Sequence, residues 1–93
     1  MKIEFDPAKS EMNARMRGLS FELVEQFDFD SAWTAIDGRK DYGEVRYRAI
    51  GALNNEVVAV VFTMRGKMVR VISLRLANRK ERRDYEEENE NRS

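Results

Sequence analysis

The sequence predicts an α+β domain: a strand and two helices near the N-terminus, an antiparallel sheet, and a C-terminal helix. Three β-prone runs follow one another: 45–53, 57–64 and 68–76. The residues between them, Asn54-Asn55 and Arg65-Gly66, tolerate positive φ and therefore predict a three-strand antiparallel meander. The run 57–62 is apolar on both faces, which is typical of a central strand. A length of 93 residues, 42% of them hydrophobic, is the size of a single domain (1–93) with one modest core.

The N-terminal part of the chain reads as one strand followed by a helix. Residues 2–5 form the expected strand. Asp6 is a good helix cap, Pro7 has the φ of a first helical residue, and Gly18 provides the C-terminal stop. The predicted apolar stripe of this helix consists of Ala8, Met12, Met16 and Leu19.

Three shorter signals complete the predicted fold. Ser20 is expected to cap a second, short helix that buries Phe21, Val24 and Phe27, and residues 32–36 indicate a weak strand. Asn78 with Glu81 three residues later resembles a capping box, so the last helix should run from Asn78 into the high eighties. The acidic tail at about 86–93 is expected to be a solvated or frayed end.

Composition removes several classes of function. The chain contains neither cysteine nor histidine, which excludes disulfides and Ser-His-Asp or Cys-His nucleophiles and makes a zinc site untenable. We therefore expect no metal and no cofactor. No apolar run approaches the ~20 residues that a membrane span needs, and the first residues lack the apolar region of a signal peptide. The expected location is the cytoplasm, without membrane contact.

The zero net charge conceals a strongly segregated charge pattern. Residues 39–83 contain twelve basic and four acidic side chains, whereas the segments on either side are acidic. Within 70–85, five arginines and one lysine stand against two acids, at a strand-to-helix junction. Local potential governs encounters with charged partners, so this junction predicts a site for a polyanion.

The order of charges in the last helix supports a functional placement. Its basic residues come first and its acidic residues last, the reverse of what the helix dipole favours. In the preceding strand, alternation places Arg70 and Arg75 on opposite faces. We expect Arg46, Arg75 and Arg79 to converge near one edge of the sheet, where arginines with tyrosines nearby suit phosphate clamping and base stacking. The plainer alternative is that these arginines are solvated charges paired with acids: Glu44, Glu56 and Glu81.

Five segments of the chain, taken together, resemble the BrnT family of toxins from type II toxin–antitoxin systems. The matching segments are Phe5-Asp-Pro-Ala-Lys9 with Asn13 and Gly18, Ser20-Phe-Glu22, Asp41-Tyr-Gly-Glu-Val-Arg-Tyr-Arg-Ala-Ile-Gly51, Thr63-Met-Arg-Gly66, and Arg70-Val-Ile-Ser-Leu-Arg-Leu-Ala with Glu81, Arg82 and Tyr85. They cover nearly the whole chain in order. The resemblance implies a RelE-like fold and a ribonuclease that inhibits translation. It also implies a BrnA-type antitoxin with a DNA-binding domain that holds the ribonuclease inactive, and a toxin dimer within the complex.

The resemblance also implies that basic residues of the sheet act on RNA. Arg75, in the stretch that looks like the family's signature, is the strongest catalytic candidate, followed by Arg46 and Arg79. The expected substrate-binding residues are Lys9, Arg17, Tyr42, Arg48, Arg70, Lys80 and Arg82. The expected reaction is metal-independent attack of an RNA 2′-hydroxyl on the adjacent phosphorus.

One position departs from the family's pattern. Met16-Arg17-Gly18 stands where the family commonly has Lys-His-Gly, and arginine, with a pKa above ~12, cannot replace histidine as a base. Glu44, Glu81 or a tyrosine are the alternatives for that role. Two further hypotheses stay open: a module that binds RNA or a partner without cutting, and a basic face whose main purpose is to meet an acidic antitoxin segment.

Overall fold

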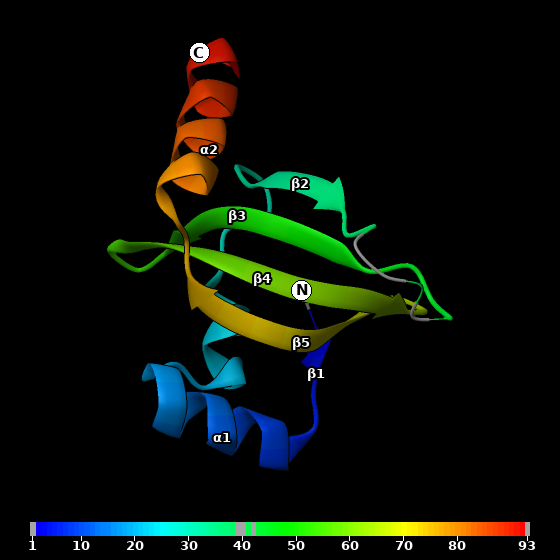
Figure 1. The fold of residues 1–93 in the computed structure, drawn as a ribbon. Helices are drawn as coiled ribbons and strands as arrows, with labels where there is room; N and C mark the ends of the chain where they lie inside the picture. The colour runs from blue at the N-terminus through cyan, green and yellow to red at the C-terminus, as the bar shows by residue number, and fades with distance from the viewer. Residues whose placement is uncertain (1, 39–40, 42, 93) are drawn as a thin grey trace.

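The fold, a computed structural model that describes residues 2–38, 41 and 43–92, combines one five-stranded sheet with three helical segments (Figure 1). In chain order the elements are β1 (Ile3–Glu4), α1 (Pro7–Arg17), the 3₁₀ helix η1 (Phe21–Gln26), β2 (Trp33–Ile36), β3 (Tyr47–Leu53), β4 (Glu56–Arg65), β5 (Met68–Leu76) and α2 (Arg79–Arg92). The α+β prediction is confirmed.

The strand order in the sheet is β1-β5-β4-β3-β2. Strands β2 to β5 are antiparallel to their neighbours, so the predicted meander is confirmed, but β1 pairs in parallel with β5. The prediction of a purely antiparallel sheet is therefore wrong, and the sheet is mixed. Asn54 has a φ of 55° and Gly66 a φ of 63°, which explains why the chain turns at these two points.

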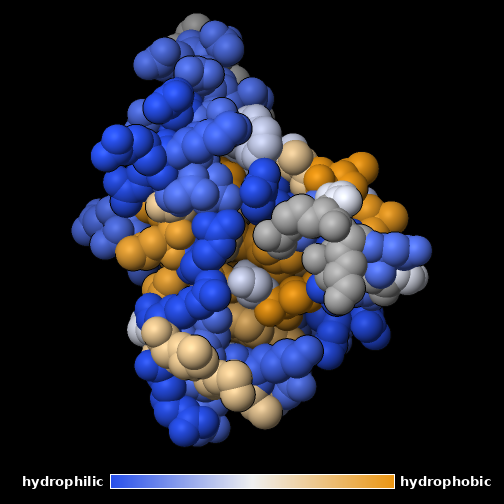
Figure 2. Space-filling model, viewed as in Figure 1, coloured by the Kyte–Doolittle hydropathy of each residue, from blue (hydrophilic) through white to orange (hydrophobic). Residues whose placement is uncertain are grey.

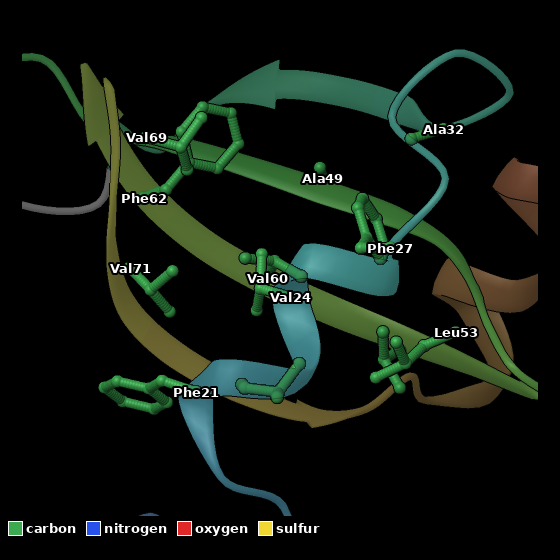
Figure 3. Packing of buried hydrophobic residues seen from close by; sticks show 12 residues of the cluster. Phe21, Val24, Phe27, Ala32, Ala49, Leu53, Val60, Phe62, Val69 and Val71 are labelled. Atoms are coloured by element: carbon green, nitrogen blue, oxygen red, sulfur yellow. The ribbon is translucent and has the colours of Figure 1, made fainter. Parts of the chain in front are cut away.

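The core lies between η1 and one face of the sheet (Figure 3). Phe21, Val24 and Phe27 are buried as predicted. They belong to the same core cluster as Val60 of the central strand, and the Val60 side chain is fully buried. The short helix is of the 3₁₀ type, and Ser20 occupies its N-cap position as predicted, although the Ser20 side chain makes no capping hydrogen bond.

The apolar stripe predicted for α1 is not buried. Met12 is 56% exposed and Met16 76% exposed, and the one buried residue of the helix is Ser10. Polar contacts attach α1 instead: the Ser10 hydroxyl accepts a hydrogen bond from the backbone N–H of Phe21, and the Asn13 amide donates to the carbonyl oxygens of Leu19 and Leu74. Hydrogen bonding to the ends of the neighbouring segments has taken the place of apolar packing.

Helix α2 extends further than predicted and projects beyond the sheet (Figure 1). The acidic stretch that we expected to fray is helical as far as Arg92. The half-buried Asn89 donates from its side-chain amide to the carbonyl oxygen of Ser31, which ties the distal part of the helix to the segment before β2.

At Gly51, β3 packs closely against the segment that follows η1. A Cβ atom at this position would lie 2.9 Å from the ring of Phe27 and 3.1 Å from the Cβ of Ala32, both buried. We expect Gly51→Ala to lower the free energy of unfolding by about 1–3 kcal/mol, because a tightly packed core must shift to admit the methyl group. Denaturant unfolding measures this. Gly38→Ala is the matched control, since a Cβ there meets no atom within 4 Å; equal stability of the two variants would contradict the packing argument.

Candidate functional site

The two faces of the sheet differ in what covers them. Residues such as Val60, Val71 and Leu74 point into the core on the η1 side. On the opposite face lie the side chains of Arg48, Arg70, Ser73 and Arg75, and we call it the arginine face. Figure 1 views the molecule from this side, and Figure 2 shows strongly hydrophilic side chains that run down from α2 and border an apolar patch over the middle of the sheet.

A bulge in β5 places Arg70 and Arg75 on the same face. Val71 pairs with Phe62 and Ser73 with Val61, so Ile72 has no partner in β4. The extra residue shifts the alternation by one position, and Val71 and Leu74 therefore both face the core. The predicted division of Arg70 and Arg75 between opposite faces is wrong for this reason.

The centre of the arginine face is a carboxylate held by two arginines. Arg75 Nη1 lies 2.7 Å from Glu81 Oε1, and Arg75 Nη2 lies 2.9 Å from Oε2, a bidentate pair. Arg48 Nη1 is 3.3 Å from the same Oε2. The Glu81 side chain is 4% exposed, whereas those of Arg75 and Arg48 are 30% and 32% exposed. The cluster thus hides its negative charge and presents a net charge of +1 at the surface.

Glu81 also closes the predicted capping box at the start of α2. Its Oε1 accepts a hydrogen bond from the backbone N–H of Asn78 at 3.0 Å, and its own N–H donates to Asn78 Oδ1 at 2.8 Å. The hydrogen bonds from Arg75 lower the pKa of Glu81 from its ordinary value of 4.5; burial acts in the opposite direction, and the Asn78 N–H and the charges of Arg75 and Arg48 lower it further. Glu81 is therefore a poor proton acceptor.

The predicted convergence of Arg46 with Arg75 is wrong. Ile50 and Arg75 both pair with Ala59, so Arg75 is level with Ile50, whereas Arg46 comes four residues earlier in the chain, just before β3. At about 3.3 Å per residue this is a separation of about 13 Å along the strand. Arg46 instead contacts Glu44, with 3.3 Å between Nε and Oε2. Arg48, two residues closer, takes the place beside Arg75.

The remaining predicted residues are distributed over the molecule. Arg70 pairs with Glu4 at 3.6 Å, and Lys80 with Asp84 at 3.1 Å. Arg79 and Arg82 are exposed in the first turn of α2. Tyr42 lies outside the described residues. The expected pairing of arginines with acids is thus confirmed for Glu44 and Glu81, while no described ion pair includes Glu56.

Lys9 and Arg17 do not join the arginine face. With Met12, Asn13, Met16, Phe21 and Ile72 they line a groove between α1 and β5, on the side of β5 that faces the core. Their predicted contact with the substrate therefore gains no support from proximity to Arg75. Trp33 was not among the predicted site residues, although its ring centre lies 5.8 Å from the Arg48 guanidinium. Knowledge of the register between β2 and β3 would have shown that Trp33 lies beside Arg48.

The described residues contain neither a metal-binding cluster nor a membrane-spanning helix. No group of three or more acidic, histidine or cysteine side chains in residues 2–38, 41 and 43–92 is arranged to hold a metal ion. Within the same ranges, no helix has the length and apolar character needed to cross a membrane.

The buried carboxylate predicts a pH-dependent loss of stability. We expect Glu81→Gln to lower the free energy of unfolding at neutral pH by about 1–3 kcal/mol, because the hydrogen bonds from Arg75 lose their charge assistance. Because the folded-state pKa is below the unfolded one, the carboxylate stabilises the fold above pH 4.5, and this contribution is lost as the pH falls through the folded-state pKa. The difference between Glu81→Gln and the unaltered chain should accordingly shrink in acid.

Denaturant unfolding between pH 7 and pH 3 measures this difference. Glu56→Gln, at an exposed position at the start of β4, is the control and should leave stability nearly unchanged. A difference for Glu81→Gln that stays constant over the whole pH range would show that the charge of Glu81 is not what stabilises the junction.

Comparison with known proteins identifies the family. The model of the ribonuclease toxin BrnT, of type II toxin–antitoxin systems, matches residues 5–81, which include every strand of the sheet from β2 to β5 and the Arg75–Glu81 pair. Among curated proteins, none matches the chain. The matched segment is well over half of the 93 residues, and the chain therefore belongs to the BrnT family of ribonuclease toxins of type II toxin–antitoxin systems.

Proposed function

We propose that the arginine face binds RNA and cleaves it by attack of a 2′-hydroxyl on the adjacent phosphorus, without a metal ion. The observation that carries the proposal is the Arg75–Glu81–Arg48 cluster: two guanidinium groups held in fixed positions by one buried carboxylate, on an accessible sheet face of a ribonuclease-toxin family member. Fixed donors that meet developing charge are a large source of rate acceleration in enzymes.

The proposed step conserves atoms and charge. The 2′-oxygen forms a bond to phosphorus and passes its proton to solvent water, and the bond from phosphorus to the 5′-oxygen breaks. The departing 5′-oxygen takes a proton from solvent water, so the products are a 2′,3′-cyclic phosphate and a 5′-hydroxyl group. Arg75 and Arg48 would stabilise the negative charge that grows on the non-bridging oxygens.

The other basic residues would hold the flanking parts of the strand. Arg79 and Arg82 stand at the junction of β5 and α2, next to the cluster in the sequence, and suit phosphates on one side. Arg46 and Arg70 lie toward the opposite end of the face and suit phosphates on the other side. Lys80 and Tyr42 keep their predicted roles in substrate binding within this proposal.

Few side chains of this protein could accept the proton of the 2′-hydroxyl group. The chain has no histidine, and Glu81 is engaged by Arg75 and Asn78. Tyr47 stacks on Phe62 on the core side of the sheet, with 5.4 Å between ring centres. Glu44, the other acidic candidate, pairs with Arg46 at the far end of the face and therefore lies out of reach of a phosphate held by Arg75 and Arg48. We therefore assign most of the acceleration to alignment of the substrate and to charge.

The type II family implies an antitoxin partner. We propose that it is of the BrnA type, with a DNA-binding domain, and that the complex acts in the cytoplasm, where the free toxin inhibits translation. A RelE-like arrangement of the fold and a toxin dimer within the complex belong to the same proposal.

A second function is favoured by one observation, the absence of histidine. A chain without this base could bind RNA on the arginine face without cutting it. Expression in a bacterium without the antitoxin, together with RNA incubation of the purified chain, separates the two functions. Growth arrest with cleavage products supports the ribonuclease, and RNA binding with intact RNA supports the binding module.

Removal of the central guanidinium should abolish most of the activity. We expect Arg75→Ala to slow cleavage of single-stranded RNA by about 10²–10³-fold, the usual effect of losing one donor to a developing oxyanion. Arg75→Lys should recover only part of the rate, because an ammonium group cannot form the bidentate pair. Arg15→Ala, exposed on α1, is the control. Folding of each variant is checked by circular dichroism, and equal rates for Arg75→Ala and the control would exclude Arg75 from the site.

The chemistry of the nucleophile gives an independent test. RNA with a single 2′-deoxynucleotide at the mapped cleavage position should stay intact at that position, because the attacking oxygen is missing. Cleavage of the unmodified RNA should persist in excess chelator. Cleavage at the deoxy position would mean that water, and not the 2′-hydroxyl, attacks the phosphorus. Loss of activity in the chelator would mean that cleavage needs a metal ion. Either result would overturn the proposed step.

A further inference from the structure

The groove between α1 and β5 combines exposed apolar side chains with two cations. It has a volume of about 240 Å³, and its apolar surface comes from Met12, Met16 and Ile72. Met12 and Met16 are more than half exposed. Lys9 and Arg17 stand on its rim, and neither makes an ion pair with another described residue, in contrast to Arg15, which pairs with Glu11 elsewhere on the same helix.

The hydrogen bonds that attach α1 hold it in an orientation that exposes the two methionines. The contacts of Ser10 and Asn13 fix the helix to the backbone of residues 19–21 and 74, and they leave the methionines outside the core. Burial of a methionine side chain is worth about 1.5–3 kcal/mol. Two such side chains left in water on an otherwise firmly held helix therefore form a surface that gains stability when a partner covers it. Methionine adapts its shape well to a bound segment.

We propose that this groove is the docking surface for an acidic, amphipathic segment of the antitoxin. This inference rests on the antitoxin partner of the proposed function and names the surface that receives it. The occupant would place aliphatic side chains against Met12, Met16 and Ile72 and carboxylates against Lys9 and Arg17. The two cations are eight residues apart on one helix, about 12 Å at 1.5 Å per residue. The matching carboxylates would be about eight residues apart in a helix or four in an extended strand.

The chemistry of the groove favours a protein over RNA or a small molecule. Sequence-tolerant RNA binding uses exposed aromatic rings, and the one aromatic residue of the groove, Phe21, is 2% exposed. A volume of about 240 Å³ is below the usual range for small-molecule sites and suits a few aliphatic side chains. The groove also lies on the opposite side of β5 from Arg75, so its occupant can be held there without replacing Glu81.

The test measures the affinity of the chain for its cognate BrnA-type antitoxin, both purified, at low and high salt. In the first pair of variants, Met12→Gln with Met16→Gln removes the apolar surface, and Met64→Gln, an exposed methionine at the end of β4, is the matched control. In the second pair, Lys9→Glu with Arg17→Glu reverses the rim charges, and Arg15→Glu is the control on the same helix.

We expect each groove variant to raise the dissociation constant at least tenfold and each control to change it less than threefold. Lys9→Glu with Arg17→Glu should also remove most of the salt dependence of binding. The RNA cleavage rate of Met12→Gln with Met16→Gln should equal that of the unaltered chain. If the unaltered chain cuts no RNA, the proposed function fails while the affinity measurement still decides the docking surface.

Three outcomes would overturn the proposal. Equal antitoxin affinity in groove variants and controls would place the interface elsewhere. Slower RNA cleavage by Lys9→Glu with Arg17→Glu, at unchanged antitoxin affinity, would make the groove an RNA site. Self-association of the chain alone in sedimentation, abolished by Met12→Gln with Met16→Gln, would make the occupant a second copy of this chain.

Discussion

The carboxylate of Glu81 is the constraint on which the arrangement of the arginine face depends. It joins three elements: Arg48 comes from β3, Arg75 from β5, and the capping hydrogen bond comes from the backbone just before α2. A buried carboxylate is costly unless its charge is compensated, and here two guanidinium groups and a backbone N–H compensate it. The same contacts limit the rotamers of both arginines. The stability of the junction and the proposed binding of a phosphate on this face therefore rest on the same contacts.

The bulge at Ile72 decides which residues share that face. Without it, strict alternation would send Arg70 and Arg75 to opposite sides, as the sequence pattern predicts. With it, Val71 and Leu74 both enter the core, and the polar residues Arg70, Ser73 and Arg75 all point away from it. A single unpaired residue thus converts a mixed pattern into a segregated one. Sequence alone offers no signal for this bulge, since neither glycine nor proline marks it.

Local signals predicted most of the fold, and the predictions failed where distant contacts decide. The capping box at Asn78 and Glu81 and the buried residues of η1 follow from short-range chemistry, and all were predicted. The parallel pairing of β1 with β5 and the place of Arg48 beside Arg75 depend on strand order and register, which local sequence patterns do not reveal. The periodicity of α1 was read correctly as an apolar stripe. Its burial was predicted wrongly, because the hydrogen bonds of Ser10 and Asn13 orient the helix differently.

The capping box and the Asn89 contact explain how α2 tolerates an unfavourable order of charges. Basic residues at a helix start and acidic residues toward its end each cost some tenths of a kcal/mol against the helix dipole. A capping interaction contributes about 0.5–2 kcal/mol, and the reciprocal pair of Asn78 and Glu81, with the anchor at Asn89, holds the helix at both ends. The anchored helix can therefore carry Arg79 and Arg82 beside the sheet and direct its acidic end away from it (Figure 1). For the proposed RNA substrate, this order places positive charge beside the sheet and negative charge away from it, which is an arrangement that favours electrostatic steering.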